Sequence, residues 1–85
     1  MAATIFAAVD EGYDVTRIDG YKGIVDYAKG YTTANGSEVT LSVAKQEIKD
    51  KGCIRLYNYD ADDLEEAKQE GSVRGADWTY RIIKL

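Results

Sequence analysis

The chain has no histidine and no proline, and only one of its 85 residues is a cysteine. Histidine is the commonest general base at neutral pH and the commonest metal ligand, so its absence argues against catalysis and against a metal site. The lone Cys53 cannot form an internal disulfide and has no histidine to activate it, so we expect a buried structural thiol. We therefore predict no catalytic residues, no metal and no cofactor, and a reducing compartment such as the cytoplasm.

Positive charge is in the minority as well. Eleven Lys and Arg residues face fifteen Asp and Glu residues, which gives a formal net charge of -4. The basic residues are scattered along the chain, and a surface of this charge repels phosphate backbones, so we expect no direct nucleic-acid binding. Residues 1–9 are apolar, but no basic residue precedes them and Asp10 follows, which predicts neither a signal peptide nor a membrane span.

Tyrosine is the abundant aromatic residue, with seven copies against one phenylalanine. A tyrosine ring offers a large contact area and its hydroxyl needs a polar partner, so tyrosine suits half-exposed positions and interface cores. Apolar residues make up 45% of the chain and charged residues 31%, which is typical of a folded protein. The length predicts a single domain over residues 1–85. The composition favours a binding module over an enzyme.

An N-terminal hairpin is predicted by two β-capable segments on either side of a turn. Residues 3–9 form the first segment, residues 10–12 the turn and residues 13–18 the second segment, which alternates between two faces. A helix over residues 5–9 is the alternative, because short apolar runs are ambiguous.

Three helices are predicted from capping residues at their starts and glycines at their ends. The paired start and end signals are Asp19 and Gly30, Thr40 and Gly52, and Asp60 and Gly71. Helical spacing gives each helix an inner face. The residues of these faces are Tyr21, Ile24, Val25, Ala28 and Tyr31 in the first helix, Leu41, Ala44 and Ile48 in the second, and Ala61, Leu64 and Ala67 in the third.

Residues 53–59 and 77–85 are predicted strands, and Asn35-Gly36 predicts a tight turn in either a short hairpin or a loop. Strands at both ends with helices between them indicate an α+β domain. We expect a small two-layer domain with a mixed or antiparallel sheet and helices packed mainly on one face. Residues 53–85 are compatible with a right-handed crossover. The other sheet face would then be wet, which would explain the excess of tyrosine.

The densest charged segment covers residues 60–70, with the sequence DADDLEEAKQE. A calcium loop is excluded, because counting from Asp60 puts Glu65 at the sixth place and Gly71 at the twelfth. On a helix, the acidic side chains point away from Leu64. Either they form a solvated face, or they engage a basic partner and imitate the phosphates that it normally holds. The residues that we expect to contact a basic partner are Asp62, Asp63, Glu65, Glu66 and Glu70.

An aromatic patch is the second candidate site. We expect Tyr57 and Tyr59 to be partly exposed on the polar side of their strand, near Trp78 or Tyr80 if the two strands pair. Packing of this face beneath the helices is the alternative. An exposed patch of this kind would resemble a platform for stacking bases, but the acidic balance argues against that use.

The chain is short and acidic, lacks catalytic residues, and carries the acidic segment 60–70 and the pair Tyr57 and Tyr59. In these features it resembles the small acidic proteins with which phages block bacterial defence, anti-CRISPR proteins among them. This resemblance implies binding to a nucleic-acid-handling complex and occlusion of its basic groove. No residue role follows from it, because those proteins share no common fold.

The sequence thus predicts a non-enzymatic protein-binding module, an inhibitor that uses the acidic helix, Tyr57, Tyr59 and Trp78 to engage a basic protein or nucleoprotein complex. A small homo-oligomeric regulatory domain that associates through a Tyr-rich sheet face is the alternative. A small enzyme or ligand-binding protein that uses carboxylates is a third reading.

Overall fold

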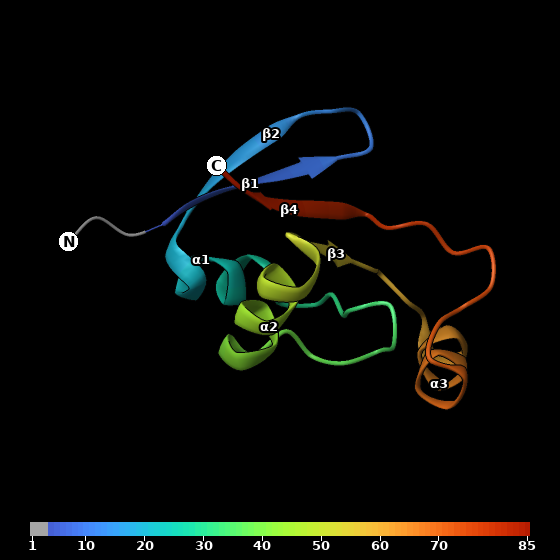
Figure 1. Cartoon of the computed structure of the whole chain (residues 1–85). Helices are drawn as coiled ribbons and strands as arrows, with labels where there is room; N and C mark the ends of the chain where they lie inside the picture. Colours follow the sequence, from blue (N-terminus) through green and yellow to red (C-terminus); the bar gives the residue numbers. More distant parts are fainter. Residues whose placement is uncertain (1–3) are drawn as a thin grey trace.

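Four strands form one antiparallel sheet in a computed structural model that describes residues 4–85 (Figure 1). The strand order is β2-β1-β4-β3, so the C-terminal strand lies between the first and the third. Residue 3, where we expect the first strand to begin, lies outside the described residues. In chain order the elements are β1 (Ile5–Asp10), β2 (Val15–Asp19), α1 (Gly20–Tyr27), α2 (Leu41–Lys51), β3 (Cys53–Leu56), α3 (Ala61–Glu70) and β4 (Tyr80–Lys84).

Helices α1 and α2 cover one face of the sheet, and α3 lies apart near one end of it (Figure 1). The core forms between this face and the two helices. Its fully buried large side chains come from both layers: Phe6, Ile24, Ile54, Leu56 and Ile82. The α+β class and the one-sided cover that the sequence predicts are therefore confirmed.

The predicted hairpin and two of the three predicted helix starts are confirmed in detail. β1 and β2 pair antiparallel. The Thr40 hydroxyl accepts the backbone N–H of Val43, and the Asp60 carboxylate accepts that of Asp63. These bonds satisfy amide groups that have no partner within the helix. The helix starts were predictable because such caps are local interactions.

The first helix differs from its prediction at both ends. Asp19 precedes α1 without a side-chain capping bond, because its carboxylate accepts the Arg17 side chain at 3.0 Å. α1 ends at Tyr27, three residues before Gly30. Beyond it, the N–H of Lys29 bonds to the carbonyl of Asp26, and the N–H of Tyr31 to that of Ala28. These tighter three-residue bonds end the α-helix early.

Two residues that we assigned to inner helix faces lie outside the core. Leu41 is 47% exposed, and Ala61 is also exposed. Both are the first residues of their helices, where the chain has not yet reached the layer against which the helix packs. The inner positions deeper in these helices, Ala44 and Ala67, are fully buried.

The crossover that we considered for residues 53–85 is wrong, because β3 and β4 are antiparallel neighbours. Both strands are also shorter than predicted. β3 ends at Leu56 because the next residue, Tyr57, pairs with Thr32 and not with β4. The N–H of Tyr57 donates to the carbonyl of Thr32 at 2.8 Å, and the N–H of Thr32 donates to the carbonyl of Tyr57 at 3.0 Å. Trp78 accordingly lies outside β4. The predicted turn at Asn35-Gly36 sits in a loop that holds one isolated bridge, between Thr32 and Glu38.

Four of the seven tyrosines pack on the helix side of the sheet, and none of the paired strand positions of the uncovered face holds one, so the proposed explanation of their number by a wet sheet face is wrong. Tyr80 meets Tyr27 and Tyr31 edge to face, each at 5.3 Å between ring centroids. Tyr21 packs in the same manner on Phe6 at 5.0 Å. Their rings cover the edge of the core between α1 and the sheet. Tyrosine suits this position because its ring packs on the core while its hydroxyl stays near water.

Gly23 marks the closest approach of α1 to the sheet. A Cβ atom there would lie 2.9 Å from Cγ2 of Ile18, a buried methyl group that cannot move aside freely. Alanine would favour the helix by about 1 kcal/mol, but overpacking of a core costs about 1–3 kcal/mol.

We therefore expect Gly23→Ala to lower the free energy of unfolding by about 1 kcal/mol, against the sign of helix propensity. Chemical denaturation followed by circular dichroism measures the change. Lys22→Ala, at the exposed neighbouring position, is the control and should shift stability by less than about 0.5 kcal/mol. A Gly23→Ala protein more stable than the wild type would contradict this packing.

Candidate interaction surface

The acidic helix α3 forms because its ends are capped and its charges suit its dipole. The Asp60 carboxylate accepts the N–H of Asp63 at 2.8 Å. Asp62 and Asp63 occupy the first turn, where negative charge interacts favourably with the positive end of the helix dipole. Gly71, with a φ of 87°, ends the helix in the left-handed conformation that glycine adopts without strain.

α3 is held to the rest of the molecule by the turn at Asn35-Gly36. A Cβ atom at Gly36 would meet Leu64 and Lys68 of α3, each at 3.2 Å, so the turn backbone packs directly on the helix. On the same side, the Tyr59 hydroxyl donates to the carbonyl of Ala34 at 2.9 Å. These contacts fix the orientation in which α3 presents its other side to solvent.

The outward side of α3 carries the predicted acidic residues. Asp62, Glu65, Glu66 and Glu70 are exposed and line one open hollow of about 650 Å³, together with Gln69, Ser72 and Arg74. Asp63 is half-buried and is not among the residues that line this hollow. Among residues 4–85, the three ion pairs are Arg17–Asp19, Lys29–Asp26 and Lys51–Glu47. The carboxylates of α3 thus lie side by side without a cation bound to them.

Tyr57 and Tyr59 lie at the base of α3 and stack on each other with ring centroids 5.2 Å apart. Both are half-buried, in line with the prediction that they are partly exposed. Burial raises the pKa of the Tyr59 hydroxyl. Its neighbours Tyr57, Asp63 and Glu66 raise this pKa further, while a hydrogen bond with the Val73 backbone opposes them. Both the burial and the acidic residues therefore favour a neutral Tyr59.

The other aromatic residues of the predicted patch lie elsewhere. Trp78 lines a separate hollow of about 270 Å³ with Glu11, Tyr13 and Asp77, beside the turn of the β1–β2 hairpin. Tyr80 points into the helix layer, because its register places it beside Leu56 on the buried face. The structure thus brings Tyr57 and Tyr59 to the acidic helix and leaves Trp78 on another part of the surface.

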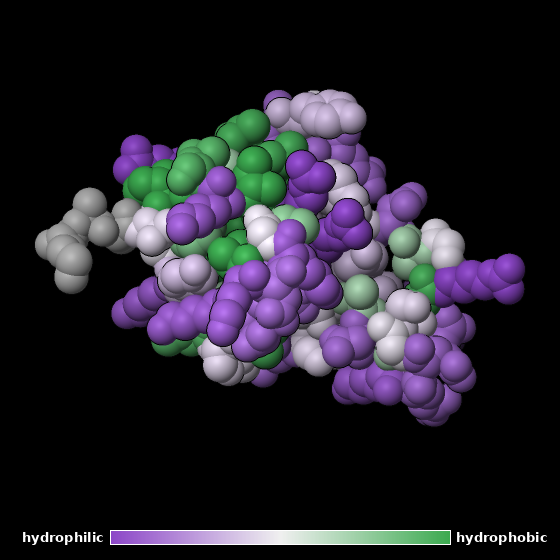
Figure 2. All heavy atoms as spheres, viewed as in Figure 1, coloured by the Kyte–Doolittle hydropathy of each residue, from purple (hydrophilic) through white to green (hydrophobic). Residues whose placement is uncertain are grey.

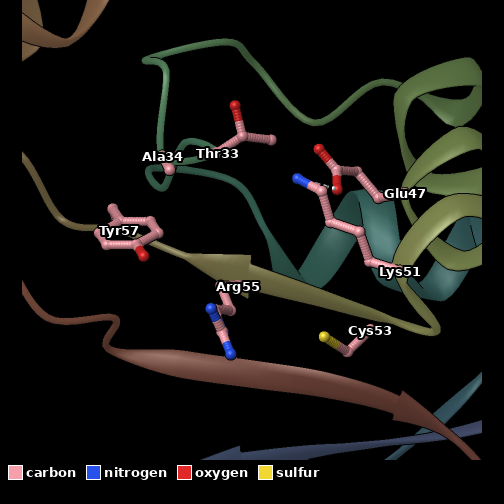
Figure 3. A pocket seen from close by; sticks show the side chains of 7 residues that line it. All are labelled: Thr33, Ala34, Glu47, Lys51, Cys53, Arg55 and Tyr57. Carbon is pink, nitrogen blue, oxygen red and sulfur yellow. Dashed lines mark ion pairs between the residues drawn. The ribbon is translucent and has the colours of Figure 1, made fainter. Parts of the chain in front are cut away.

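A cavity of about 320 Å³ lies beside β3, between the C-terminal end of α2 and the loop at Thr33 and Ala34 (Figure 3). Its charged groups are Glu47 and Lys51, which form an ion pair at 3.0 Å, and Arg55. Tyr57 and Cys53 also line the cavity, and because Cys53 is half-buried there, the prediction of a buried thiol is wrong. This set offers cations and hydroxyl groups for weak polar contacts.

Within residues 4–85, no group of three or more histidine, cysteine, aspartate and glutamate side chains is arranged to hold a metal ion. In the same part of the chain, no helix has the length and apolar character needed to span a bilayer. Comparisons with protein-family models, curated proteins and solved structures found no significant match.

Sequence reasoning missed the face of the sheet that α1 and α2 leave uncovered. We expected tyrosines there, but its paired strand positions hold aliphatic residues together with Arg17, Asp19, Cys53, Arg55 and Arg81. The signal was present in β1, where residues 5–9 are apolar on both faces of the strand. A strand with this pattern is typical of a sheet that is covered on both sides.

The tyrosine environments predict the behaviour at high pH. Burial raises the pKa of Tyr27 above the ordinary value of 10.0, with Tyr80 adding to the shift against a hydrogen bond from Thr16. A hydrogen bond to Tyr80 raises the pKa of Tyr31, followed by burial. Tyr59 shifts in the same direction. Each neutral hydroxyl therefore stabilises the fold fully below pH 10.0, and this contribution is lost as the pH rises through the pKa of the folded state.

We expect the ultraviolet absorbance of tyrosinate in the native protein to show a group of tyrosines that ionise above pH 10.0, and the free energy of unfolding to fall over the same range. Tyr59→Phe removes one of these late-titrating groups and is the internal control. Ionisation of all seven tyrosines in one step at pH 10.0, with constant stability, would contradict these environments.

Proposed function

We propose that this chain is a non-enzymatic protein-binding module, an inhibitor that engages the basic surface of a protein or nucleoprotein complex. The observation that carries the proposal is the exposed face of α3. There, Asp62, Glu65, Glu66 and Glu70 share one hollow, and no ion pair of residues 4–85 involves them.

Physical chemistry supports an acidic partner-binding face at this place. Residues three and four apart on a helix have Cβ atoms about 5–6 Å apart, and like charges at this spacing raise each other's free energy. Cationic side chains of a partner would relieve that repulsion and would speed association by long-range attraction. The contacts of Gly36 and Tyr59 hold α3 in place before binding, so little conformational entropy would be lost.

The same arrangement supports a partner that normally holds nucleic acid. A row of carboxylates offers negative charge to arginine and lysine side chains in much the way that phosphates do. The resemblance to small acidic phage proteins that block bacterial defence, anti-CRISPR proteins among them, points to the same class of partner. The free thiol of Cys53 fits action in the cytoplasm.

The homo-oligomer alternative depended on a Tyr-rich sheet face. Within residues 4–85 the uncovered face carries no tyrosine at its paired strand positions, since Tyr80 points into the helix layer. We therefore do not favour association through that feature.

The test begins with capture of a partner on immobilised protein, followed by affinity measurements on variants. Glu65→Lys with Glu66→Lys should weaken binding about tenfold or more at low salt, because it reverses charge within the acidic face. Added salt should reduce the difference in affinity between the wild type and this variant, because it screens the charges. The nucleic acid that the partner normally holds should compete with this protein for binding.

Glu11→Lys with Glu38→Lys is the matched control, because both positions are exposed and lie outside α3. Both double variants raise the formal net charge by four, from -4 to 0. If the control weakens binding as much as the α3 variant, overall charge is responsible. Unchanged affinity of the α3 variant would show that the acidic helix is a solvated face.

A further inference from the structure

The uncovered face of the sheet is a second surface, distinct from α3. Alternation along each strand places Ile5, Ala7 and Val9 of β1 on this face, opposite the side of Phe6 and Ala8. Cross-strand pairing then defines two complete rows across the four strands. The first row holds Arg17, Ala7, Ile83 and Cys53, and the second holds Val15, Val9, Arg81 and Arg55.

This face is largely aliphatic, with Ala7 buried at its centre and the most exposed apolar side chains at its margin. Val15 is 66% exposed and Leu85, beyond the end of β4, is 71% exposed, while Ile5, Val9 and Ile83 are half-buried. In Figure 2, hydrophobic surface gathers over the part of the molecule where Figure 1 shows β1, β2 and the C-terminus. Contiguous apolar surface on a soluble protein marks an interaction site more often than chance.

Arg55 and Arg81 give this face its charge. They are direct cross-strand partners, so their Cβ atoms lie about 4.5–5.5 Å apart on the same side of the sheet. Like charges in this position destabilise a sheet. Both side chains are exposed, and the three ion pairs of residues 4–85 involve neither of them. The nearby carboxylates are already paired with other cations, since Asp19 of the same face binds Arg17 and Glu47 of the cavity beside Arg55 binds Lys51.

We propose that the uncovered sheet face docks a protein partner whose contact surface is an amphipathic helix with an aliphatic stripe bordered by two carboxylates. The stripe would cover Val9, Val15 and Ile83, and the carboxylates would bind the paired guanidinium groups of Arg55 and Arg81. Guanidinium and carboxylate groups match in shape and form parallel hydrogen bonds. The bound carboxylates would remove the repulsion between the two arginines.

Charge complementarity selects this occupant over the others. A second copy packed face to face would bring two more exposed cationic groups into the interface, which makes four with both copies of Arg55 and Arg81. Anionic lipid surfaces and nucleic acids carry a much higher density of negative charge than a helix with two carboxylates, so the net charge of -4 opposes their binding more strongly. The proposal does not depend on the function of α3, because the two surfaces share no residue.

The test uses a labelled synthetic amphipathic peptide helix of about 20 residues with a leucine stripe and a Glu pair at i, i+4 along its border. A second peptide has Lys at the two Glu positions. Fluorescence anisotropy should show that the wild-type protein binds the Glu peptide about tenfold more tightly than the Lys peptide or better. Arg55→Glu with Arg81→Glu should reverse this preference, which no loss of folding can produce.

Two further variants separate the surfaces. Val15→Asp should abolish binding of the Glu peptide, because a charge would enter the aliphatic stripe. Glu65→Lys with Glu66→Lys should leave the peptide affinity unchanged, and an effect there would assign the peptide to α3.

The proposal is overturned if neither peptide binds or if both bind equally. It is also overturned if sedimentation shows that the protein is a dimer and that Arg55→Glu with Arg81→Glu alters the dimerisation. That result would mean that a second copy of the chain occupies this face. Vesicles of anionic phospholipid are the third probe. If the protein binds them and the same variant abolishes that binding, the face is a membrane-binding surface and the proposal is wrong.

Discussion

The pairing of β4 with both β1 and β3 is the constraint on which the rest of the structure depends. The last strand of the chain lies in the middle of the sheet, so the sheet is complete only when the C-terminal segment has joined it. Ile82 pairs with Ala8 on one side and with Ile54 on the other, and all three are buried in the same core. Because these pairs are antiparallel, the chain has to leave β3 and enter β4 at the same end of the sheet.

This connection between β3 and β4 explains where α3 lies and why the helix can be so acidic. The connection from β3 to β4 starts and ends beside one edge of the core, so its helix needs to bury only a narrow side. Ala67 and half-buried Leu64 provide that side, and the Gly36 turn receives it. The remaining positions are free of packing constraints. A charge density that a core helix could not tolerate therefore costs little stability here.

Local signals predicted most of the elements, and long-range pairing explains what they could not predict. The caps at Thr40 and Asp60 act within one turn, so the helix starts were visible in the sequence. The lengths of β3 and β4 were not, because Tyr57 pairs with Thr32 of a distant loop. The acidic side of α3 followed from helical spacing alone. The place of Tyr80 depended on the register of β4, which only the folded sheet defines.

The two surfaces together show that charge is sorted by position in this chain. A one-sided sheet usually alternates apolar and polar residues, yet β1 is apolar on both faces and its neighbour β4 adds Arg81 beside Arg55. Five of the fifteen acidic residues stand together on α3, while no ion pair among residues 4–85 joins a carboxylate to Arg55 or Arg81. If the net charge served solubility alone, carboxylates scattered near the arginines would stabilise the sheet at the same net charge. Unpaired charge on both surfaces supports the two proposed partner surfaces, one basic and one carrying carboxylates.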